Sequence, residues 1–214
     1  MYTLFVAPNS YAMTVHAMLE DMGVEYDLKW VTLFTGSPDP ELKAISPHCR
    51  VPALRYPGGA LCETGAIAWF LAEQFPESGM LVASDDPQRG QFLQWFHYLA
   101  TTLQPEVMLQ FHPESYFTDS ERQGDLKLAS MQRLCKVLSI IENTLSKGGF
   151  FMGKKRTLLD YLFALQAVWP EIYPTSIEDY PCISGLVDEM TTRSAVSDVI
   201  RLHEGRRNEK IWPL

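Results

Sequence analysis

The chain has 214 residues, of which 46% are hydrophobic, and its 26 acidic and 18 basic side chains give a net charge of −8. This composition is typical of a globular protein, and the acidic balance argues against a nucleic-acid binder, because no basic excess is available to displace counterions from phosphates. The longest apolar runs, such as residues 66–72, are much shorter than the ~20 residues of a membrane-spanning helix, so no membrane segment is expected.

The N-terminus has no basic start of the kind found in secretory signals, and the four cysteines are scattered without a CxxC pair. So few thiols in a chain of this length argue against a disulfide framework and fit a reduced, cytoplasmic setting. No pair of Cys or His residues has the spacing of zinc ligands, so the sequence predicts no metal site.

The first part of the chain alternates strand-like and helix-like patterns. The strand-like runs are residues 3–7, 25–33, 53–56 and 60–63, and the helical ones are residues 11–22, a short stretch near Leu42, and residues 64–75. Pro57-Gly58-Gly59 predicts a hairpin between the last two strands, and Gly23 closes the first helix. The order βαβ, short helix, ββα predicts a mixed four-stranded sheet with one face buried under residues 11–22 and 64–75.

The second part shows helical periodicity and no convincing strand. Apolar stripes run through residues 92–103, 126–145, 158–167, 183–190 and 196–200. Residues 78–87 are rich in turn formers and are predicted to be a linker. We therefore expect an α/β domain over residues 1–77 and an all-α domain over residues 88–214.

Two short segments carry the chemical information. Val51-Pro52 enters a strand, and if that bond is cis, the N–H and C=O of Val51 can pair with an extended peptide at the sheet edge. Glu63-Thr64 lies where a strand ends and a helix begins, so Thr64 and the free N–H groups there favour a carboxylate, while Glu63 suits an ammonium group. Such a site is complementary to the γ-glutamyl end of glutathione.

The same features resemble a known family. The βαβ, short helix, ββα order, the Val51-Pro52 pair and the Glu63-Thr64-x-Ala66-Ile67 segment are similar to the thioredoxin-like domain of cytosolic glutathione transferases, above all the bacterial beta-like members. In the helical half, Thr157 and Asp160 match that family's N-capping box, in which the two side chains close the start of a buried helix. The resemblance covers nearly the whole chain and implies this two-domain fold.

The resemblance implies a glutathione site. Val51, next to Pro52, would bind the cysteinyl backbone, Glu63 and Thr64 the γ-glutamyl group, and Arg50 the glycyl carboxylate. His48 and Lys43 are weaker candidates for the glycyl carboxylate. Counting from the tryptophan of the first helix in the second domain, His97, Thr101 and Gln104 fall on positions that reach the site in beta-like members.

The residue that activates the glutathione thiol lies in the turn after the first strand, according to the resemblance. Family members use Tyr, Ser, Cys or Asn there, and this chain offers Asn9, Ser10 and Tyr11. Ser10 is favoured narrowly, because it could also cap the following helix. The turn has no cysteine, which argues against a mixed-disulfide mechanism from this position.

The function implied is that of a glutathione transferase, in which the activated thiol attacks a hydrophobic electrophile held by the helical domain. Glutathione is the co-substrate, and the resemblance implies a homodimer. Two alternatives stay open. One is glutathione-dependent reduction of peroxides or disulfides, and the other is a non-catalytic protein of the same fold that serves interaction or regulation.

Overall fold

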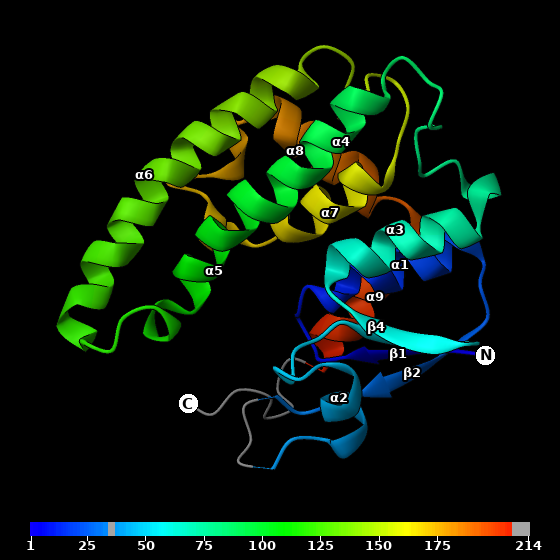
Figure 1. Ribbon diagram of the computed structural model, residues 1–214. Coiled ribbons are helices and arrows are strands. Elements are labelled where there is room, and N and C mark those ends of the chain that lie inside the picture. Colours follow the sequence, from blue (N-terminus) through cyan, green and yellow to red (C-terminus); the bar gives the residue numbers. More distant parts are fainter. Residues whose placement is uncertain (34–36, 207–214) are drawn as a thin grey trace. The chain divides into compact units, whose positions relative to one another are not determined.

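A computed structural model describes residues 1–33 and 37–206 of the chain (Figure 1). It divides into two compact units, Met1–Leu81 together with residues from Thr191 onward, and Val82–Met190. The sequence assigned everything from residue 88 to the helical domain, whereas the structure groups the last helix, α9 (Ser194–Gly205), with the first unit. The reason is that α9 packs along α1 (Ala12–Met22) and buries Val196, Val199 and His203.

The first unit is built on the four-stranded sheet that the sequence predicted. Its strands are β1 (Tyr2–Val6), β2 (Tyr26–Trp30), β3 (Ala53–Tyr56) and β4 (Gly59–Cys62), in the spatial order β2-β1-β3-β4. β1 runs parallel to β2 and antiparallel to β3, and β3 and β4 form the expected hairpin. The sheet is therefore mixed, and the thioredoxin-like arrangement is confirmed.

Helices cover both faces of the sheet (Figure 1). α1 and α3 (Thr64–Gln74) pack on one face, where the buried core consists of Leu4, Val6, Ala12, Val15, Leu19, Leu54, Ile67 and Leu71. α2 (Pro40–Ile45) places Leu42 against Phe5 and Ala53 on the other face. The alternation of Leu4 and Val6 with Phe5 along β1 thus directs successive side chains into two separate cores.

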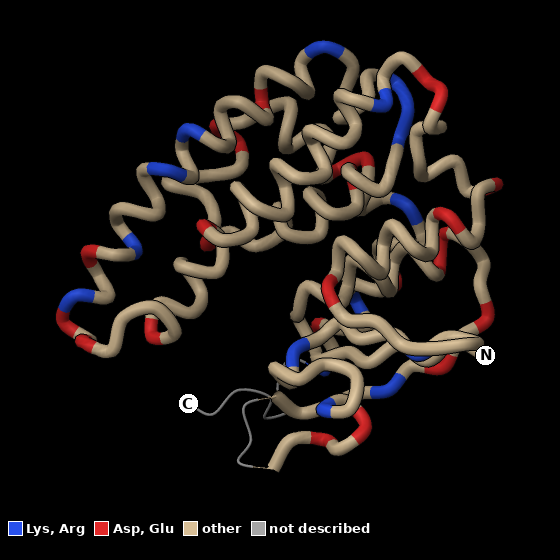
Figure 2. The backbone as a smooth tube through the Cα atoms, viewed as in Figure 1, with Lys and Arg blue, Asp and Glu red and all other residues tan. Residues whose placement is uncertain are grey.

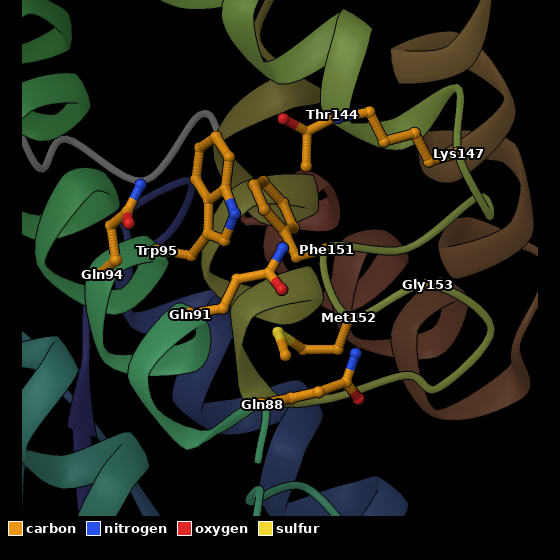
Figure 3. Close-up of a pocket in the computed structure, with 9 residues that line it drawn as sticks. All are labelled: Gln88, Gln91, Gln94, Trp95, Thr144, Lys147, Phe151, Met152 and Gly153. Atoms are coloured by element: carbon orange, nitrogen blue, oxygen red, sulfur yellow. The ribbon is translucent and has the colours of Figure 1, made fainter.

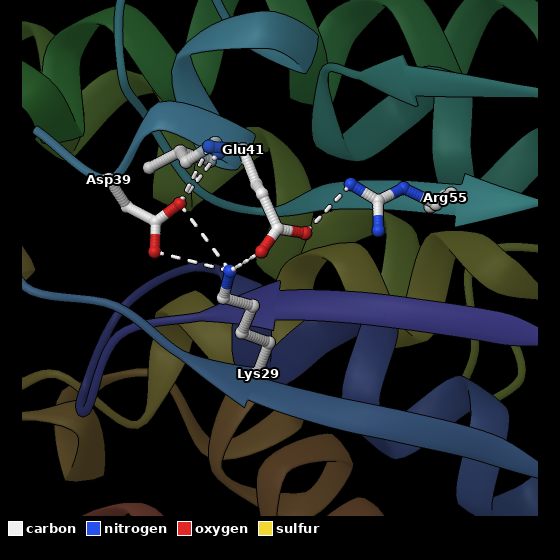
Figure 4. A network of polar contacts seen from close by, with 5 residues as sticks. Lys29, Asp39, Glu41 and Arg55 are labelled. Carbon is white, nitrogen blue, oxygen red and sulfur yellow. Dashed lines mark hydrogen bonds and ion pairs between the residues drawn. The ribbon is translucent and has the colours of Figure 1, made fainter.

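A cluster of four charged residues connects α2 to the sheet (Figure 4). Lys29 Nζ on β2 lies 3.2 Å from Asp39 and 2.6 Å from Glu41, and Arg55 on β3 lies 3.0 Å from Glu41. Asp39 also caps α2, since its carboxylate accepts hydrogen bonds from the N–H groups of Glu41 and Leu42. The backbone N–H of Leu42 and the ammonium of Lys29 lower the pKa of Asp39. The short helix before the Val51 loop is therefore fixed by both capping and ion pairs.

Residues 82–190 contain helices and isolated β-bridges only, in agreement with the all-α expectation. The helices are α4 (Arg89–Tyr98), the π-helical segment η2 (Leu99–Leu103), α5 (Gln104–Phe111), α6 (Ser120–Leu145), α7 (Leu158–Ala167) and α8 (Pro181–Thr191). Short 3-10 turns are η3 (Pro113–Ser115), η4 (Pro170–Ile172) and η5 (Ile177–Asp179), and a further one, η1 (Pro76–Ser78), belongs to the first unit. Acidic and basic residues are interspersed along α6 (Figure 2), as on a solvated helix face. None of the helices in the described ranges is long and apolar enough to cross a membrane.

The start of α7 confirms the predicted capping box. Thr157 is the N-cap, and both reciprocal hydrogen bonds with Asp160 are present. The Asp160 carboxylate accepts from the N–H groups of Thr157 (2.7 Å) and Phe151 (3.0 Å), and it is fully buried. This box closes a helix whose ten residues are all buried.

The π-helical segment η2 is the main local departure from the predicted helical stripe. Pro105 follows it, near the start of α5. Proline has no N–H, and its ring would collide with the carbonyl four residues earlier in a regular α-helix. A widened turn before Pro105 removes that collision, a detail that apolar periodicity cannot reveal.

Candidate functional site

The register of the sheet brings the first-unit candidates to one end of it. Phe5 pairs with Ala53, and Ala53 pairs with Cys62. The turn after β1, the loop before β3 and the residue after β4 therefore all leave the sheet at the same end. Asn9–Tyr11, Arg50–Pro52 and Glu63–Thr64 belong to these three segments, so the topology places the predicted residues together.

The turn after β1 differs from the sequence expectation at Ser10. The N-cap position of α1 is Tyr11, no side chain caps the helix, and the Ser10 hydroxyl donates instead to the carbonyl of Ala7 at 2.6 Å. The expectation that the Ser10 side chain caps α1 is therefore wrong, because the hydroxyl turns back towards the end of β1. Asn9 has a left-handed backbone (φ 48°), a conformation that Asn adopts more readily than most residues.

This turn offers hydrogen-bond donors in a half-buried position. Within the described ranges, the Asn9 amide and the N–H of Ala12 have no hydrogen-bond partner, whereas the Ser10 hydroxyl hydrogen is used by Ala7. The N-terminus of α1 adds the positive end of a helix dipole. Donors and a positive potential of this kind stabilise a thiolate.

The loop before β3 presents an extended backbone edge. Buried Ser46 holds the loop, because its Oγ accepts from the N–H of Arg50 (3.0 Å) and its carbonyl accepts from the N–H of Cys49 (2.8 Å). The Val51–Pro52 bond is cis, as the family resemblance implied. Among the residues that the structure describes, nothing pairs with the N–H or C=O of Val51. Both groups are thus available to a peptide-like ligand.

Glu63 has the most unusual backbone of the site. It is exposed, it lies between β4 and α3, and its φ of 77° and ψ of 113° fall outside the regions that non-glycine residues favour. Strained residues of this kind cluster at binding and catalytic sites. The carboxylate of Glu63 faces no ion-pair partner within the described ranges, so it can receive an ammonium group.

The N-terminus of α3 behind Glu63 has unused donors. The first helical hydrogen bond runs from the N–H of Ile67 to the carbonyl of Glu63, and no side chain caps the helix. The N–H groups of Thr64, Gly65 and Ala66 have no hydrogen-bond partner in the part of the chain that is described. Free N–H groups at the start of a helix bind carboxylates well.

The remaining candidates fall in two places. Lys43 on α2 and His48 and Arg50 in the following loop are all exposed, so their charges are open to solvent. Three others, His97, Thr101 and Gln104, belong to the helical unit. There the Thr101 hydroxyl donates to the carbonyl of His97 at 2.8 Å, and the Gln104 side chain accepts from Gln166. Thr101 and Gln104 therefore already have partners within that unit.

The helical unit contains a pocket of about 410 Å³ (Figure 3). It is lined by Gln88, Gln91, Gln94, Trp95, Thr144, Lys147, Phe151, Met152 and Gly153, and none of the predicted site residues is among them. The rings of Trp95 and Phe151 meet edge to face, with centroids 5.2 Å apart, but glutamine amides and a lysine surround them. A pocket for hydrophobic electrophiles is expected to be mostly apolar, so this polar pocket is not assigned to that role.

No three or more His, Cys, Asp or Glu side chains cluster in a way that could hold a metal ion, as far as the described ranges extend. Sequence reasoning also missed a pair of buried histidines, His16 and His203, which are in contact. They are 187 positions apart. No spacing in the sequence could have signalled this pair, because only the packing of α9 on α1 brings the two rings together.

Comparisons with known proteins find the family that the sequence resembles. A family model for the N-terminal domain of glutathione S-transferase matches residues 10–74, and one for the C-terminal domain matches residues 106–194. Glutathione S-transferase GstA of Escherichia coli O157:H7 is 25% identical over 92% of this chain and 96% of its own length. Glutathione S-transferase F10 of Arabidopsis thaliana is 28% identical over 85% of this chain and 87% of its own length.

Solved structures show the same fold. A sphingomonad glutathione S-transferase complexed with glutathione has a TM-score of 0.81 at 22% identity and covers 94% of this chain and 98% of its own. A glutathione transferase homologue from Sulfitobacter with bound glutathione has a TM-score of 0.83 at 24% identity, with the same coverage of 94% and 98%. The arrangement of strands and helices described above is therefore that of these proteins.

Proposed function

We propose that this chain, which belongs to the cytosolic glutathione transferase superfamily, binds glutathione and activates its thiol. The proposed site is the end of the sheet formed by the Asn9, Val51 and Glu63 segments. The observation that carries the proposal is the start of α3, where a strained, exposed Glu63 precedes three N–H groups that have no partner among the described residues. A carboxylate beside a free helix N-terminus is complementary to an α-amino acid, which has one ammonium and one carboxylate group. The γ-glutamyl residue of glutathione is such a group.

The other contacts follow from the shape of the tripeptide. The N–H and C=O of Val51, which lack partners in the described chain, would pair with the backbone of the cysteinyl residue as a short antiparallel strand. The exposed Arg50 guanidinium would attract the glycyl carboxylate. The sulfur would then lie towards the turn after β1, because that turn leaves the same end of the sheet.

Thiol activation is the chemical task of that turn. A free thiol has a pKa of ~8.5, and lowering it by ~2 units requires ~2.7 kcal/mol of preferential stabilisation of the thiolate. Asn9, Ser10 and Tyr11 are the side chains proposed to supply it, together with the N-terminus of α1. Ser10 would have to release the Ala7 carbonyl to donate to sulfur, whereas the Asn9 amide has no competing partner in the described ranges. Asn9 therefore becomes the first residue to test.

The thiolate would attack an electrophilic carbon, forming a C–S bond as the leaving group departs. The hydrophobic nature of the electrophile, a homodimeric state and a cytoplasmic location belong to this proposal. Light scattering during gel filtration measures the oligomeric state directly.

Calorimetric titration with reduced glutathione at pH 7.5 tests the binding site. Glu63→Ala should weaken binding about 10–100-fold, because one hydrogen bond to a charged group contributes about 1.5–3 kcal/mol. Glu77→Ala, which removes an exposed carboxylate of the same unit, should bind as the wild type does and controls for net charge. Absence of wild-type binding at millimolar glutathione would overturn the proposal.

The activating residue is identified by titrating the thiol of bound glutathione through its ultraviolet thiolate absorbance. The variants are Asn9→Ala, Ser10→Ala and Tyr11→Phe. The one that removes the decisive donor should raise the pKa of the bound thiol back towards ~8.5 while leaving glutathione affinity nearly unchanged. If all three variants keep the wild-type thiol pKa, the side chains of this turn do not activate the thiol. Product analysis with peroxide in place of an electrophile separates transfer from reduction.

A further inference from the structure

Two buried histidines of the first unit are in contact through their ring nitrogens. Nδ1 of His16 on α1 is 3.1 Å from Nε2 of His203 on α9, and the two residues are 2% and 0% exposed. Only one hydrogen fits between these two nitrogens, so one ring donates and the other accepts. The accepting ring must therefore be neutral, and the contact has no acceptor when both imidazoles are protonated.

The surroundings offer little to balance a proton on His203. Within the described ranges no carboxylate pairs with it, and its Nδ1 makes no hydrogen bond of regular geometry, although the Ala7 carbonyl lies beside the ring. The ring packs on Trp30 of β2 with centroids 4.8 Å apart, and the Arg206 guanidinium covers that Trp30 ring at 4.5 Å. The positive charge of Arg206, which follows the end of α9, opposes protonation of His203.

The side of His16 is more polar. Glu20 on α1 lies 4.0 Å from its Nε2, and Tyr26 of β2 faces the ring edge to face while its hydroxyl donates to Glu20. Burial lowers the pKa of His16 to about 4, although Glu20 acts in the opposite direction. Burial also lowers the pKa of His203 to about 3, helped by His16. Both are far below the ordinary value of 6.5, so the pair is neutral at neutral pH.

The pair adjoins the turn that carries Asn9, Ser10 and Tyr11. The carbonyl of Ala7, which accepts from the Ser10 hydroxyl, lies beside the His203 ring and favours its protonated form. His16 is on α1, whose first turn continues from Tyr11. A second tie between the helices, the 2.6 Å ion pair of Asp21 and Arg193, joins the end of α1 to the start of α9. α9 thus supports the turn from its buried side.

We propose that His203 is a positioning residue for thiol activation, and that its neutral contact with His16 keeps α9 docked so that the Ala7–Tyr11 turn holds its donors in place. Both rings bind protons more readily once they are exposed than they do in the buried pair, so mild acid favours the undocked state of α9 and disorders the turn. The role in activation rests on the proposed function, whereas the docking itself does not.

Hydrogen exchange of α9 measures the docking without glutathione. A histidine that is neutral when buried and has a pKa near 6.5 when exposed shifts the opening equilibrium about tenfold between pH 7.5 and pH 5.5. Protection factors of wild-type α9 should therefore fall about a hundredfold for the two histidines together. His203→Gln keeps an amide nitrogen near the position of Nε2 and should show only about a tenfold fall, from His16. The His16→Gln, His203→Gln double variant should show none.

His112→Gln, which removes a histidine of the other unit, is the matched control and should behave as the wild type does. Circular dichroism at both pH values separates local undocking from global unfolding. Wild-type protection that does not change between pH 7.5 and 5.5 in a folded chain would overturn the docking inference. The inference would also be overturned if α9 protection in the double variant fell between pH 7.5 and 5.5 as much as it does in the wild type.

The effect on chemistry is measured with glutathione and chlorodinitrobenzene at pH 7.5. His203→Leu can neither donate to nor accept from His16, so kcat should fall about tenfold or more, because small displacements of a catalytic group are costly. KM for glutathione should change little, since Val51 and Glu63 are untouched, and the pKa of the bound thiol should rise. His203→Gln should recover most of kcat. Equal losses in kcat and in glutathione affinity, without a thiol pKa change, would overturn the positioning role.

Failure of the proposed function and failure of the inference about the histidines give different results. If the wild type does not bind glutathione at pH 7.5, the proposed function is wrong, and the exchange experiment still decides whether the histidine pair docks α9. If the wild type binds glutathione and α9 protection is independent of pH, only the inference about the histidines fails.

Discussion

The N-termini of α7 and α3 differ in whether side chains bond their backbone N–H groups. At α7, the buried side chains of Thr157 and Asp160 accept hydrogen bonds from the N–H groups of Asp160 and Thr157, and the Asp160 carboxylate also accepts from the N–H of Phe151. At α3, the preceding Glu63 is exposed and strained, and the first N–H groups have no partner in the described chain. The difference fits the proposal that the start of α3 binds the carboxylate of glutathione, whereas the start of α7 serves folding.

The start of α1 belongs with that of α3. No side chain caps it, and the preceding Asn9 has positive φ, as Glu63 does. A protein selected only for stability gains about 1 kcal/mol from each side-chain cap. The starts of α4 and α9 also lack side-chain caps, so what sets α1 and α3 apart is the positive-φ residue before each of them at one end of the sheet, which fits the proposed glutathione site.

The largest expected effect is on the α7 side of the comparison. Asp160→Ala should destabilise the chain by about 3 kcal/mol or more, because it leaves the buried N–H groups of Phe151 and Thr157 without partners. Asp160→Asn keeps one acceptor and should lose less. Urea denaturation measures both, and glutathione affinity of the folded fraction should be that of the wild type. If Asp160→Ala weakened glutathione binding and left stability unchanged, the start of α7 would not serve folding alone.

The next largest effect is an increase in stability, expected from a substitution at the start of α3. Glu63→Gly should raise the free energy of unfolding by about 1 kcal/mol, because glycine adopts positive φ without strain, although it adds some disorder to the unfolded chain. Glu63→Ala keeps the strained backbone and should leave stability nearly unchanged. Both variants should lose glutathione affinity in calorimetry. If Glu63→Gly is less stable than Glu63→Ala, the strain at this residue does not store free energy for binding.

Local patterns explain why much of this was predictable from the sequence. The alternation in β1, the turn formers after Tyr56 and the Thr157-Asp160 spacing are encoded within a few residues, so sheet, hairpin and capping box were all expected. The site segments Val51-Pro52 and Glu63-Thr64 were found through a family resemblance that depends on their order. Their roles in binding stay predictions.

Features decided by distant packing or by one torsion were missed. The contact of His16 with His203 and the grouping of α9 with the first unit depend on tertiary packing, which leaves no periodic signal. The Ser10 hydroxyl can donate to the carbonyl of Ala7 or turn to cap a helix, and the difference is one rotation of its side chain. Sequence reasoning has no access to that choice.

The smallest predicted effect concerns the N-terminus of α2, which is capped like that of α7 and partly exposed like that of α3. Asp39 caps α2 as Asp160 caps α7, but it is partly exposed and also pairs with Lys29 (Figure 4). Asp39→Ala should cost about 1 kcal/mol, the usual value of a lost N-cap. Asp39→Asn keeps the cap acceptor and loses only an exposed ion pair, which contributes a few tenths of a kcal/mol.

Urea denaturation at low and high salt separates the two contributions at Asp39. The small difference between wild type and Asp39→Asn should vanish in high salt, because exposed charges are screened, whereas the cost of Asp39→Ala should persist, because a cap hydrogen bond is short-ranged. α2 leads into the loop that holds Val51, so Asp39→Ala should also weaken glutathione binding slightly, about twofold. If Asp39→Asn is as costly as Asp39→Ala at high salt, charge and not capping fixes α2, and its N-terminus would resemble neither that of α7 nor that of α3.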